Sequence, residues 1–530
     1  MSQALNDAVH WADLTADKLI RANADKDLYT LASGITPSGV VHFGNFREVI
    51  TVDLVARALK KRGKKVRFIF SWDDYDTFRK VPLNLPKQDE LAKYLFNPIV
   101  DTPDPFGAHE SYAAHHEKNF EEQIAKMGVV VEPLYQAKKY RGGEYREQIK
   151  NTLKKRDIIA GILNKWRATP LDNNWWPVSV YCEKCNRDKT AVTHYDGDST
   201  ITYVCEFDEC KHHGLENLNT TTRAKLPWRM DWPMRWAFEK VDFEPGGKDH
   251  SSEGGSFTTA KEIVAQVYDW KPPMYLQYDF VSIKGMGGKM SSSKGNLVTV
   301  NDVLEVYEPE MVRWIFASYK TNTDFALSFD LDVVKNYEDF DRMERLAFGV
   351  ESGNEKKVAM AKRVYELSQI GEAPTEMPFQ PAFRHLCNVL QINDLDVSRA
   401  RGFYNNDIKN ERDERRFKER AQRAAYWIEN SAPEEFKFSL NKEALKIEMN
   451  DKQTIFLSTL YTYLSNEWKS ISDDKALHEK MYEMINALEL EPMDVFTLLY
   501  KKLINLEKGP KLAGFIRTIG QERVLKLLVP

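Results

Sequence analysis

Cysteine is scarce in this sequence, and long hydrophobic runs are absent. Only 5 of the 530 residues are cysteines, which is too few for a disulfide framework. No apolar stretch approaches the ~20 residues needed to cross a bilayer. The first residues, MSQALNDAVHWADL, are polar and acidic, whereas a secretory leader begins with cations and continues with apolar residues. These absences predict a soluble, cytoplasmic protein.

A large excess of charge of either sign is also missing. The 75 lysine and arginine residues are balanced by 79 aspartate and glutamate residues, which gives a formal net charge of −4. This balance excludes a protein that coats nucleic acid with a uniformly basic surface, but it permits a local basic face. A chain of 530 residues is too long for a single hydrophobic core, so we expect two or three domains.

The amino-terminal part has the pattern of an α/β fold with a parallel sheet. Residues 28–35 are typical of a short buried strand, residues 46–63 of an amphipathic helix and residues 64–74 of a second strand. Strand, helix and strand in this order predict a right-handed βαβ unit. We expect the sheet to resume later, with aromatic strands in 225–257, a helix at 259–270 and a strand at 274–285.

Two changes in composition divide the chain. Residues 151–224 depart sharply from the flanking segments and hold four of the five cysteines, which indicates an insertion. From about residue 336 onward, amphipathic patterns follow one another without strand signals, which predicts a helical domain. The expected organisation is therefore a Rossmann-type domain in two halves, 1–150 and 225–335, an insertion at 151–224 and a helical domain at 336–530.

Two glycine-containing loops suggest a nucleotide site. TPSGVVHFGN (36–45) follows the first predicted strand, and GMGGKMSSSKGN (285–296) follows a later one. His42 at a helix start would lie beside the positive helix end, where triphosphate oxygens bind well, and Gly44 would let a flat base approach the backbone. Lys289 would stabilise negative charge that develops on phosphorus. Together the loops predict activation of a carboxylate by ATP.

Four cysteines have the spacing of a metal site. Cys182 and Cys185 form one knuckle, and Cys205 and Cys210 form a second, looser one. Four thiolates suit a closed, tetrahedral and therefore structural Zn²⁺ site. His212 or His213 could replace Cys210 as the fourth ligand, and a knuckle without metal remains an alternative.

Adjacent aspartates follow the second predicted strand. Asp73 and Asp74 would lie at the sheet edge that carries the nucleotide loops, near several tryptophans. Carboxylates and an apolar wall are what an amine-bearing substrate requires. Because side chains alternate along a strand, we expect one aspartate to face an ammonium group and the other to cap a helix or face solvent. The alternative is that both serve as helix caps or turn residues.

The paired loops resemble the signatures of class I aminoacyl-tRNA synthetases, which the family writes as H-I-G-H and K-M-S-K-S. Asn45 stands where the second histidine is usual, and Ser292 where the second lysine is usual. The sequence leaves open whether Lys294 replaces that charge. The run SGITPSGVVHFGN, FIFSWDDYD, DWPMRW, GKDH and GKMSSSKGN is similar to the class I lysyl-tRNA synthetases over essentially the whole catalytic half.

This resemblance implies a ligase that forms lysyl-adenylate from lysine and ATP and passes it to tRNA(Lys). It implies catalytic roles for His42, Asn45 and Lys289, and amino-acid contacts by Gly34, Thr36, His250 and Tyr275, with Trp228 or Trp232 beside the aliphatic stem. As carboxylates suited to an ammonium group, Asp73 and Asp74 are also expected in this amino-acid site. The ATP site that the resemblance implies comprises Pro37, Gly39, His42, Gly44, Asn45, Gly247, Asp249, Lys289, Met290, Ser291, Ser292 and Ser293. Mg²⁺ would accompany ATP, structural Zn²⁺ is expected at the cysteines, and neither DNA nor a membrane is an expected partner. The helical domain would read the anticodon.

Two other interpretations stay open. A glutamyl-type or cysteinyl-type enzyme of the same class is the nearest competitor, and Arg235 is the residue that could serve a glutamate side chain. A non-catalytic zinc- and RNA-binding paralogue is the second. The densest basic run is interleaved with acidic residues, which favours a solvated, paired helix face over an RNA contact. Its basic residues are Lys409, Arg412, Arg415, Arg416, Lys418, Arg420 and Arg423.

Overall fold

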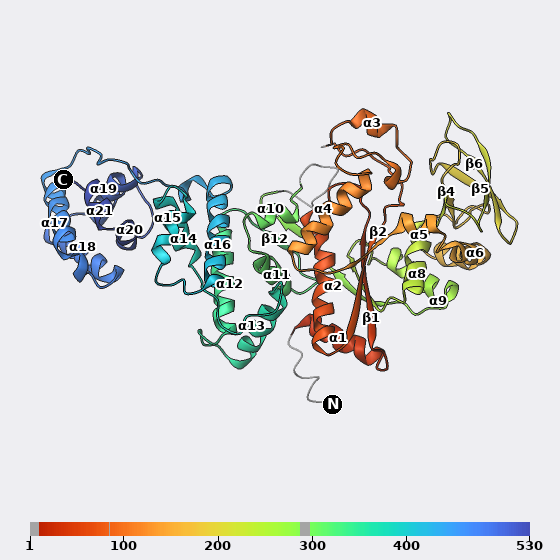
Figure 1. The fold of residues 1–530 in the computed structure, drawn as a ribbon, viewed down its shortest axis with the longest axis horizontal. Coiled ribbons are helices and arrows are strands. Elements are labelled where there is room, and N and C mark those ends of the chain that lie inside the picture. Colours follow the sequence, from red (N-terminus) through yellow and green to blue (C-terminus); the bar gives the residue numbers. More distant parts are fainter. Residues whose placement is uncertain (1–9, 84, 287–296) are drawn as a thin grey trace. The chain divides into compact units, whose positions relative to one another are not determined.

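The computed structural model describes residues 10–83, 85–286 and 297–530 (Figure 1). Their contacts divide the chain into two units. The first unit runs to Leu304 and includes Pro309–Leu327 and Gly349–Ala373. The second unit consists of Glu305–Glu308, Ser328–Phe348 and Pro374–Pro530. Residues 349–373 pack with the first unit although they follow the boundary expected at 336.

A five-stranded parallel sheet forms the centre of the first unit. Its strands lie in the order β10-β9-β1-β2-β3, and every neighbouring pair is parallel. The strand order reverses direction between β1 and β9, which makes the carboxyl ends of these two strands a topological switch point where ligands bind in such sheets. The strands are β1 (Leu28–Ile35), β2 (Lys65–Trp72), β3 (Glu132–Tyr135), β9 (Phe243–Gly247) and β10 (Met274–Tyr278).

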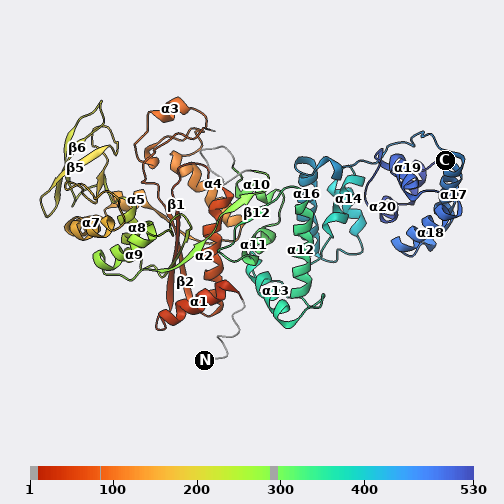
Figure 2. The same cartoon turned by 180° about the vertical axis from the view of Figure 1, so that it is seen from behind.

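Side chains alternate between the two faces of this sheet. Ala32 and Ile69 pack with Trp232 and Trp236 of α8 and with α9, so these helices cover one face. Helix α2 connects β1 to β2 and packs against both strands and β9. Figure 2 shows the sheet and its helices from behind. The bounds of these helices are α2 (Phe43–Lys61), α8 (Trp228–Glu239) and α9 (Ser256–Val267).

The aromatic strands expected within 225–257 are only partly correct, because the tryptophan-rich residues Trp228–Glu239 form helix α8. Trp228, Trp232 and Trp236 recur every four residues, which places them on one face of a helix. Their aromatic character favours a strand locally, but burial of this face against the sheet determines the outcome. Pro227 precedes the first helical residue, and Pro233 is accommodated inside the helix. After the helix, Phe243–Gly247 form strand β9.

The strand expected at 274–285 is interrupted. Strand β10 ends at Tyr278, and the chain then leaves the main sheet to form β11 (Val281–Ile283), which pairs with β12 (Phe325–Leu327) in a separate two-stranded parallel sheet. The break is fixed by hydrogen bonds from the Asp279 N–H to the Thr321 carbonyl at 2.9 Å and from the Phe280 N–H to Asp324 at 2.9 Å.

The cysteine-rich segment has its own small sheets and core. Strands β5, β6 and β7 form an antiparallel sheet, and β4 pairs with β8. Tyr181, Tyr203 and Leu218 are buried in its core, which also receives residues of α6 and α7. The strands are β4 (Ser179–Val180), β5 (Thr190–Tyr195), β6 (Thr200–Cys205), β7 (His213–Asn217) and β8 (Ala224–Lys225).

The remaining elements of the first unit surround the sheet and its loops. They are α1 (Trp11–Ala22), α3 (Gln88–Ala92), η1 (Ile99–Asp101), α4 (Tyr112–Lys126), α5 (Gln136–Gly142), α6 (Arg146–Lys154), α7 (Arg156–Asn164), α10 (Val300–Leu304), α11 (Pro309–Ser318) and α13 (Glu355–Ser368).

The second unit is helical, as expected. One apolar core joins residues of α17 to α21, including Phe456, Leu499 and Ile516. The elements are α12 (Asp332–Ala347), α14 (Phe383–Ile392), α15 (Val397–Arg401), η2 (Gly402–Tyr404), α16 (Glu411–Asn430), η3 (Glu434–Phe436), α17 (Asp451–Glu467), η4 (Trp468–Ser470), α18 (Asp474–Ala487), α19 (Pro492–Ile504), α20 (Leu512–Ile519) and α21 (Gln521–Leu527).

The basic run lies largely on α16, and its expected solvation is only partly correct. Arg415 and Lys418 are exposed, but Arg420 is fully buried. The Arg420 guanidinium pairs with Glu308 at 2.6 Å and with Asp341 at 2.9 Å. Ion pairs therefore hold α16 inside its unit, and part of the basic run serves the fold.

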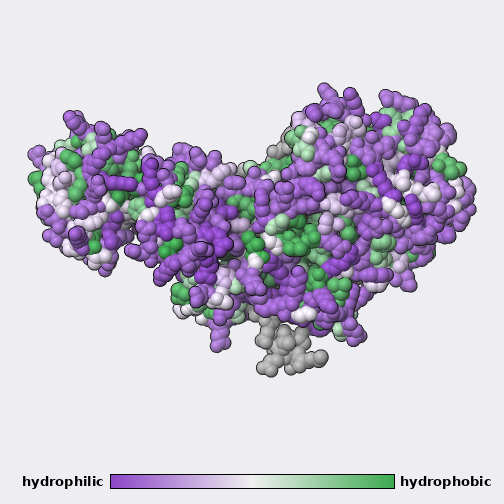
Figure 3. All heavy atoms as spheres, in the orientation of Figure 1, coloured by the Kyte–Doolittle hydropathy of each residue, from purple (hydrophilic) through white to green (hydrophobic). Residues whose placement is uncertain are grey.

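The molecular face drawn in Figure 3 is predominantly hydrophilic, with apolar residues scattered over it. Among the residues with described positions, no helix combines the length and the apolar character that crossing a membrane requires.

Candidate active site

A cavity of 450 Å³ lies at the switch point of the sheet. It is bounded by the end of β1, the start of α2, the loops after β2 and β9, and the end of β10. With Trp228 at the start of α8, the lining comes from five separate parts of the chain. The lining residues are Gly34, Ile35, Thr36, His42, Gly44, Asn45, Glu48, Asp73, Asp76, Trp228, Asp249, His250, Tyr278, Phe280 and Val281.

The first residues of α2 form one wall of the cavity. His42 is the N-cap residue, with extended backbone angles, and its N–H donates to Asn45 Oδ1 at 3.1 Å. The amide of Asn45 thus reaches back to the helix start, as in a capping box. This arrangement leaves the positive end of a 19-residue helix facing the cavity, where phosphate oxygens are favoured.

Asp73 and Asp74 point to different surroundings. Asp73 lines the cavity, and burial raises the pKa of its carboxyl although Arg235 opposes the shift. Asp74 does not line the cavity; its Oδ1 accepts a hydrogen bond from the Ala137 N–H at 2.7 Å, in the first turn of α5. Burial raises the pKa of Asp74 to about 7. The two neighbours therefore have different environments, and only Asp73 faces the cavity.

Arg235 is committed to carboxylates of the protein. Its Nη1 lies 2.6 Å from Asp73 Oδ1 and its Nε lies 3.3 Å from Asp231 Oδ2. The side chain is buried, and although burial lowers the pKa of Arg235, Asp231 and Asp73 raise it well above the ordinary value. A pocket for a glutamate side chain would present an arginine to the substrate, whereas this one is held by protein aspartates.

Aromatic residues form a second wall in two layers. Trp228 and His250 line the cavity with ring centroids 6.2 Å apart. Trp232 stacks on Trp228 at 5.1 Å and donates its indole N–H to Glu244 at 3.0 Å. Tyr275 hydrogen-bonds Ser251 at 2.8 Å. Trp232 and Tyr275 thus lie outside the cavity lining, where Trp232 supports Trp228.

Of the other residues expected to contact ATP, some line the cavity and others do not. Asp249 lines the cavity, whereas Gly247, Pro37 and Gly39 are buried outside its lining. A Cβ at Gly247 would lie 2.5 Å from Oδ1 of Asp249, so a side chain there would displace this carboxylate. The loop with Lys289, Met290, Ser291, Ser292 and Ser293 lies outside the described residues.

Sequence reasoning missed three polar residues of the lining. Asp76 accepts a hydrogen bond from Thr36 at 3.0 Å and pairs with Lys225. Glu48 and Tyr278 hydrogen-bond each other at 2.7 Å across α2 and β10. The one local signal for Glu48 is a carboxylate within the largely buried run FREVITV, and local patterns do not reveal its distant partner.

A second cavity of 630 Å³ adjoins the first and shares Thr36, Asp76 and Trp228 with it. It extends along the loop after β2 to the cysteine-rich segment. Arg79 pairs there with Asp188 at 2.8 Å. The other lining residues are Ser38, Thr77, Phe78, Lys80, Pro82, Ser179, Tyr181, Lys225 and Pro227.

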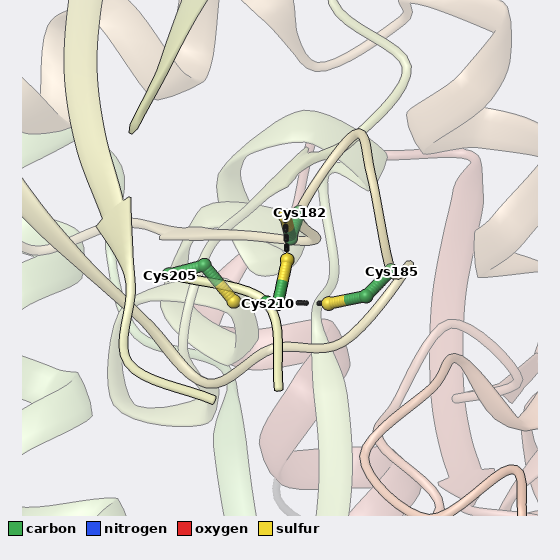
Figure 4. A group of neighbouring side chains, drawn as sticks. All are labelled: Cys182, Cys185, Cys205 and Cys210. Atoms are coloured by element: carbon green, nitrogen blue, oxygen red, sulfur yellow. Dashed lines mark hydrogen bonds between the residues drawn. The ribbon is translucent and has the colours of Figure 1, made fainter. Parts of the chain in front are cut away.

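The four clustered cysteines converge on one point, as Figure 4 shows. Cys182 Sγ lies 3.8 Å from Cys210 Sγ, and Cys185 Sγ lies 3.7 Å from Cys205 Sγ. A tetrahedral Zn²⁺ with Zn–S bonds of about 2.3 Å has S···S edges of about 3.8 Å, so the spacing fits this ion.

The neighbouring histidine is engaged elsewhere, because His212 Nε2 lies 2.6 Å from Glu183 Oε1. Four cysteines fill the coordination sphere without it, which is the donor set of a closed structural site.

A second group with metal-ligand chemistry was not expected from the sequence. His115 Nδ1 lies 3.4 Å from Asp104 and 3.3 Å from His109 Nδ1. Asp104 is buried and is fixed by backbone N–H groups of residues 106, 108 and 109. One carboxylate and two imidazoles can hold a divalent transition metal. The spacing D-x4-H-x5-H is the signal that could have revealed it.

Comparison with known proteins gives consistent likenesses. Residues 9–371 match the model of a family described as tRNA synthetases class I (K). The chain is 45% identical over 525 residues to a lysine--tRNA ligase of Treponema pallidum (strain Nichols), with 98% of each chain covered. It is 46% identical over 521 residues to that of Borreliella burgdorferi, again with 98% of each covered. The lysine--tRNA ligase of Pyrococcus horikoshii is 39% identical over 530 residues, with 98% of this chain and 99% of that protein covered.

Proposed function

The chain belongs to the class I (K) family of tRNA synthetases, and we propose that it is a lysine–tRNA ligase that activates lysine with ATP and transfers it to the terminal ribose of tRNA(Lys). The observation that carries this proposal is the full-length likeness to relatives of that name. The cavity at the switch point supports it, because its carboxylates and aromatic wall suit an amine with an aliphatic stem.

In the first step the carboxylate of lysine attacks the α-phosphorus of ATP and pyrophosphate leaves. This reaction needs positioning and charge neutralisation but no protein nucleophile. We assign the triphosphate to the amino-terminal end of α2, with His42 and Asn45 as its contacts, and Lys289 to the transition state. Asp249 would accept a hydrogen bond from a ribose hydroxyl of ATP. Mg²⁺ would enter with ATP, since the nucleotide itself supplies most of its ligands.

The amino acid would lie between the end of β1 and the aromatic wall. We assign Gly34 and Thr36 to contacts with the α-amino and α-carboxylate end of lysine, and Trp228 and His250 to contacts with its aliphatic stem. Asp73 would face an ammonium group. Trp232 and Tyr275 would support the lining residues from outside the cavity, and Asp74 would contribute through its contact with α5.

In the second step the terminal ribose of tRNA must reach the adenylate. The adjoining cavity offers a route, because it opens beside Thr36 and Trp228 and carries the exposed Lys80. Replacement of Lys80 by alanine should slow transfer to tRNA while activation of lysine is retained. We assign recognition of the anticodon to the helical unit.

Particular contacts argue against the competing functions, which are activation of glutamate and activation of cysteine. Arg235 is held by Asp73 and Asp231, which disfavours a glutamate substrate. Selection of cysteine by zinc would require an open coordination position, whereas four cysteines favour a closed one. We therefore propose Zn²⁺ at this site as a structural ion.

The test is ATP–pyrophosphate exchange with each of the twenty amino acids, followed by aminoacylation of tRNA. We expect exchange with lysine and charging of tRNA(Lys). Exchange with glutamate or cysteine would replace the proposed substrate, and the absence of exchange with any amino acid would favour a non-catalytic binding protein.

A further inference from the structure

Thr36, Asp76 and Trp228 are the described residues that line both cavities of the first unit. The first cavity lies at the switch point of the sheet, and the second extends from it toward the cysteine-rich segment. A group that enters through the second cavity therefore meets a group bound in the first beside these three side chains. What each of them can donate or accept sets the chemistry of this junction.

Asp76 is the anionic acceptor at the junction. Its Oδ2 accepts a hydrogen bond from the Thr36 hydroxyl at 3.0 Å, and its Oδ1 pairs with the Lys225 ammonium. Each carboxylate oxygen has two lone pairs, so each can accept one more hydrogen bond. The Asp76 side chain is 36% exposed, whereas that of Asp73 is 10% exposed and is held by Arg235. Asp76 can therefore still accept a hydrogen bond from a ligand.

Lys225 keeps this carboxylate ionised. It lies on β8, the last strand of the cysteine-rich segment, and its Nζ also donates to the Tyr75 carbonyl at 3.2 Å. Burial raises the pKa of Asp76, but Lys225 and the hydrogen bond from Thr36 outweigh it and bring the pKa below its ordinary value. The other charged groups that interact with this pair are Arg235, Asp73 and Asp231.

We propose that Asp76 accepts a hydrogen bond from the terminal ribose hydroxyl of tRNA and so orients it for attack on lysyl-adenylate. The inference rests on the proposed function, in which Thr36 contacts the α-carboxylate end of lysine and the second cavity admits the end of tRNA. An attacking hydroxyl must turn a lone pair toward the carbonyl carbon, so its proton needs an acceptor on another side. Asp76 is bonded to Thr36 and open to the second cavity, where the two reactants would meet.

The hydroxyl proton does not end on Asp76. In the transfer, the ribose oxygen forms a bond to the carbonyl carbon of the adenylate, the bond from this carbon to the phosphate oxygen breaks, and AMP leaves with the electron pair. The second pKa of a phosphate monoester is about 6. The pKa of Asp76 is lowered below the ordinary carboxyl value. The departing phosphate is therefore the stronger base and takes the proton, while Asp76 orients the hydroxyl.

The experiment measures the two steps of the reaction separately in wild type and Asp76→Asn. Pyrophosphate exchange with lysine and ATP measures activation. Single-turnover transfer from enzyme-bound lysyl-adenylate to tRNA(Lys) measures the second step. We expect Asp76→Asn to lower the transfer rate roughly 10- to 150-fold, the range for a hydrogen bond to a charged group, with a much smaller change in exchange.

Asp101→Asn is the matched control. Asp101 pairs with Arg141 at 2.6 Å and accepts a hydrogen bond at 2.8 Å from Asn186 of the cysteine-rich segment. It therefore also ties that segment to the first unit through a carboxylate, but it lines neither cavity. We expect Asp101→Asn to leave both rates unchanged.

Lys225→Met leaves Asp76 in place without its cation. Burial is then opposed less, so the pKa of Asp76 should rise and the carboxyl should take up a proton as the pH falls. We expect the ratio of transfer to exchange to decline in this variant as the pH is lowered from about 8 to about 5, a range in which the carboxylate of wild type stays ionised. A role in the fold alone would not produce this pH dependence.

tRNA(Lys) without its terminal adenosine tests which part of the RNA Asp76 meets. It keeps the rest of the RNA and lacks the ribose that would contact the carboxylate. It should therefore inhibit transfer equally well in wild type and in Asp76→Asn.

The inference is overturned if Asp76→Asn transfers lysine at the wild-type rate, or if exchange falls by the same factor as transfer. Weaker inhibition of this variant by the shortened tRNA would also overturn it, as would a Lys225→Met protein with the pH dependence of wild type. Failure of the proposed function is distinct, because wild type itself would then show no exchange with lysine.

Discussion

Arg235 and Asp73 form a buried ion pair beside the cavity, with Nη1 and Oδ1 2.6 Å apart and both residues less than one-tenth exposed. Residue 235 lies on α8 and residue 73 follows β2, so the pair joins a covering helix to the carboxyl end of the sheet. Because Arg235 is held in this pair, it is not available to bind the side-chain carboxylate of a glutamate substrate.

Breaking this pair should destabilise the protein. We expect Arg235→Met to lower the free energy of unfolding by about 3–5 kcal/mol, because it leaves the buried carboxylates of Asp73 and Asp231 without their cation. Asp73→Asn should cost less, because Arg235 keeps Asp231 as a partner. The double variant should lose less than the sum of the single losses. Urea unfolding of the four proteins measures this coupling, and strictly additive losses would contradict it.

Asn45 allows its capping role to be separated from a role toward ATP. Asn45→Asp keeps the oxygen that accepts the His42 N–H, but it removes the amide donors and adds negative charge near the triphosphate. We expect wild-type stability and an exchange rate lowered roughly 10-fold or more. Asn45→Ala should in addition lose about 1 kcal/mol of stability. If Asn45→Asp exchanges pyrophosphate at the wild-type rate, the residue acts as a cap alone.

The cysteine cluster predicts a metal content that mass spectrometry can measure. Cys185→Ser should remove one equivalent of zinc and lower the melting temperature, because metal binding contributes to folding of such small sites. The control is Cys387→Ser, since Cys387 is buried in the second unit and is not part of the cluster. Zinc retained in full by the Cys185 variant would exclude this ligand set.

The group of Asp104, His109 and His115 predicts a separate equivalent of a divalent transition metal. His115→Ala should lower the metal content by this one equivalent and leave the cysteine-bound zinc in place. The double variant of His115 and Cys185 should then lose both. Equal metal content in wild type and His115→Ala would oppose this site.

The sequence predicts those structural features that are determined by residues close together in the chain. The strand at 28–35, the turn and the helix that follows are specified within about thirty residues, and the same holds for the two cysteine knuckles. The sequence suggested strands where helix α8 forms, because tryptophan favours strands locally. The tryptophans recur every four residues, and this helical spacing stabilises a helix only when the sheet is present to bury their common face. Glu48 meets Tyr278 across 230 residues, a contact that only the packed sheet creates.

The second unit should lose stability in acid for a reason that can be traced to one carboxyl. Arg420 and Arg416, on α16, lower the pKa of Glu308 to about 2, although burial opposes them. Because the folded value lies below the unfolded value of 4.5, the stabilisation is complete above about pH 4.5 and is lost as the pH falls toward 2. The shift corresponds to about 3 kcal/mol.

Glu308→Gln removes this dependence together with the buried ion pairs. We expect α16 to exchange its amide hydrogens faster at neutral pH in the variant, and the difference from wild type to shrink between pH 4.5 and pH 2. Glu338→Gln is the matched control, because its exposed pair with Arg384 should contribute under about 1 kcal/mol. Hydrogen exchange resolved over residues 411–430 measures both. A difference between wild type and Glu308→Gln that stays constant down to pH 2 would show that packing, not the charge of Glu308, stabilises this helix.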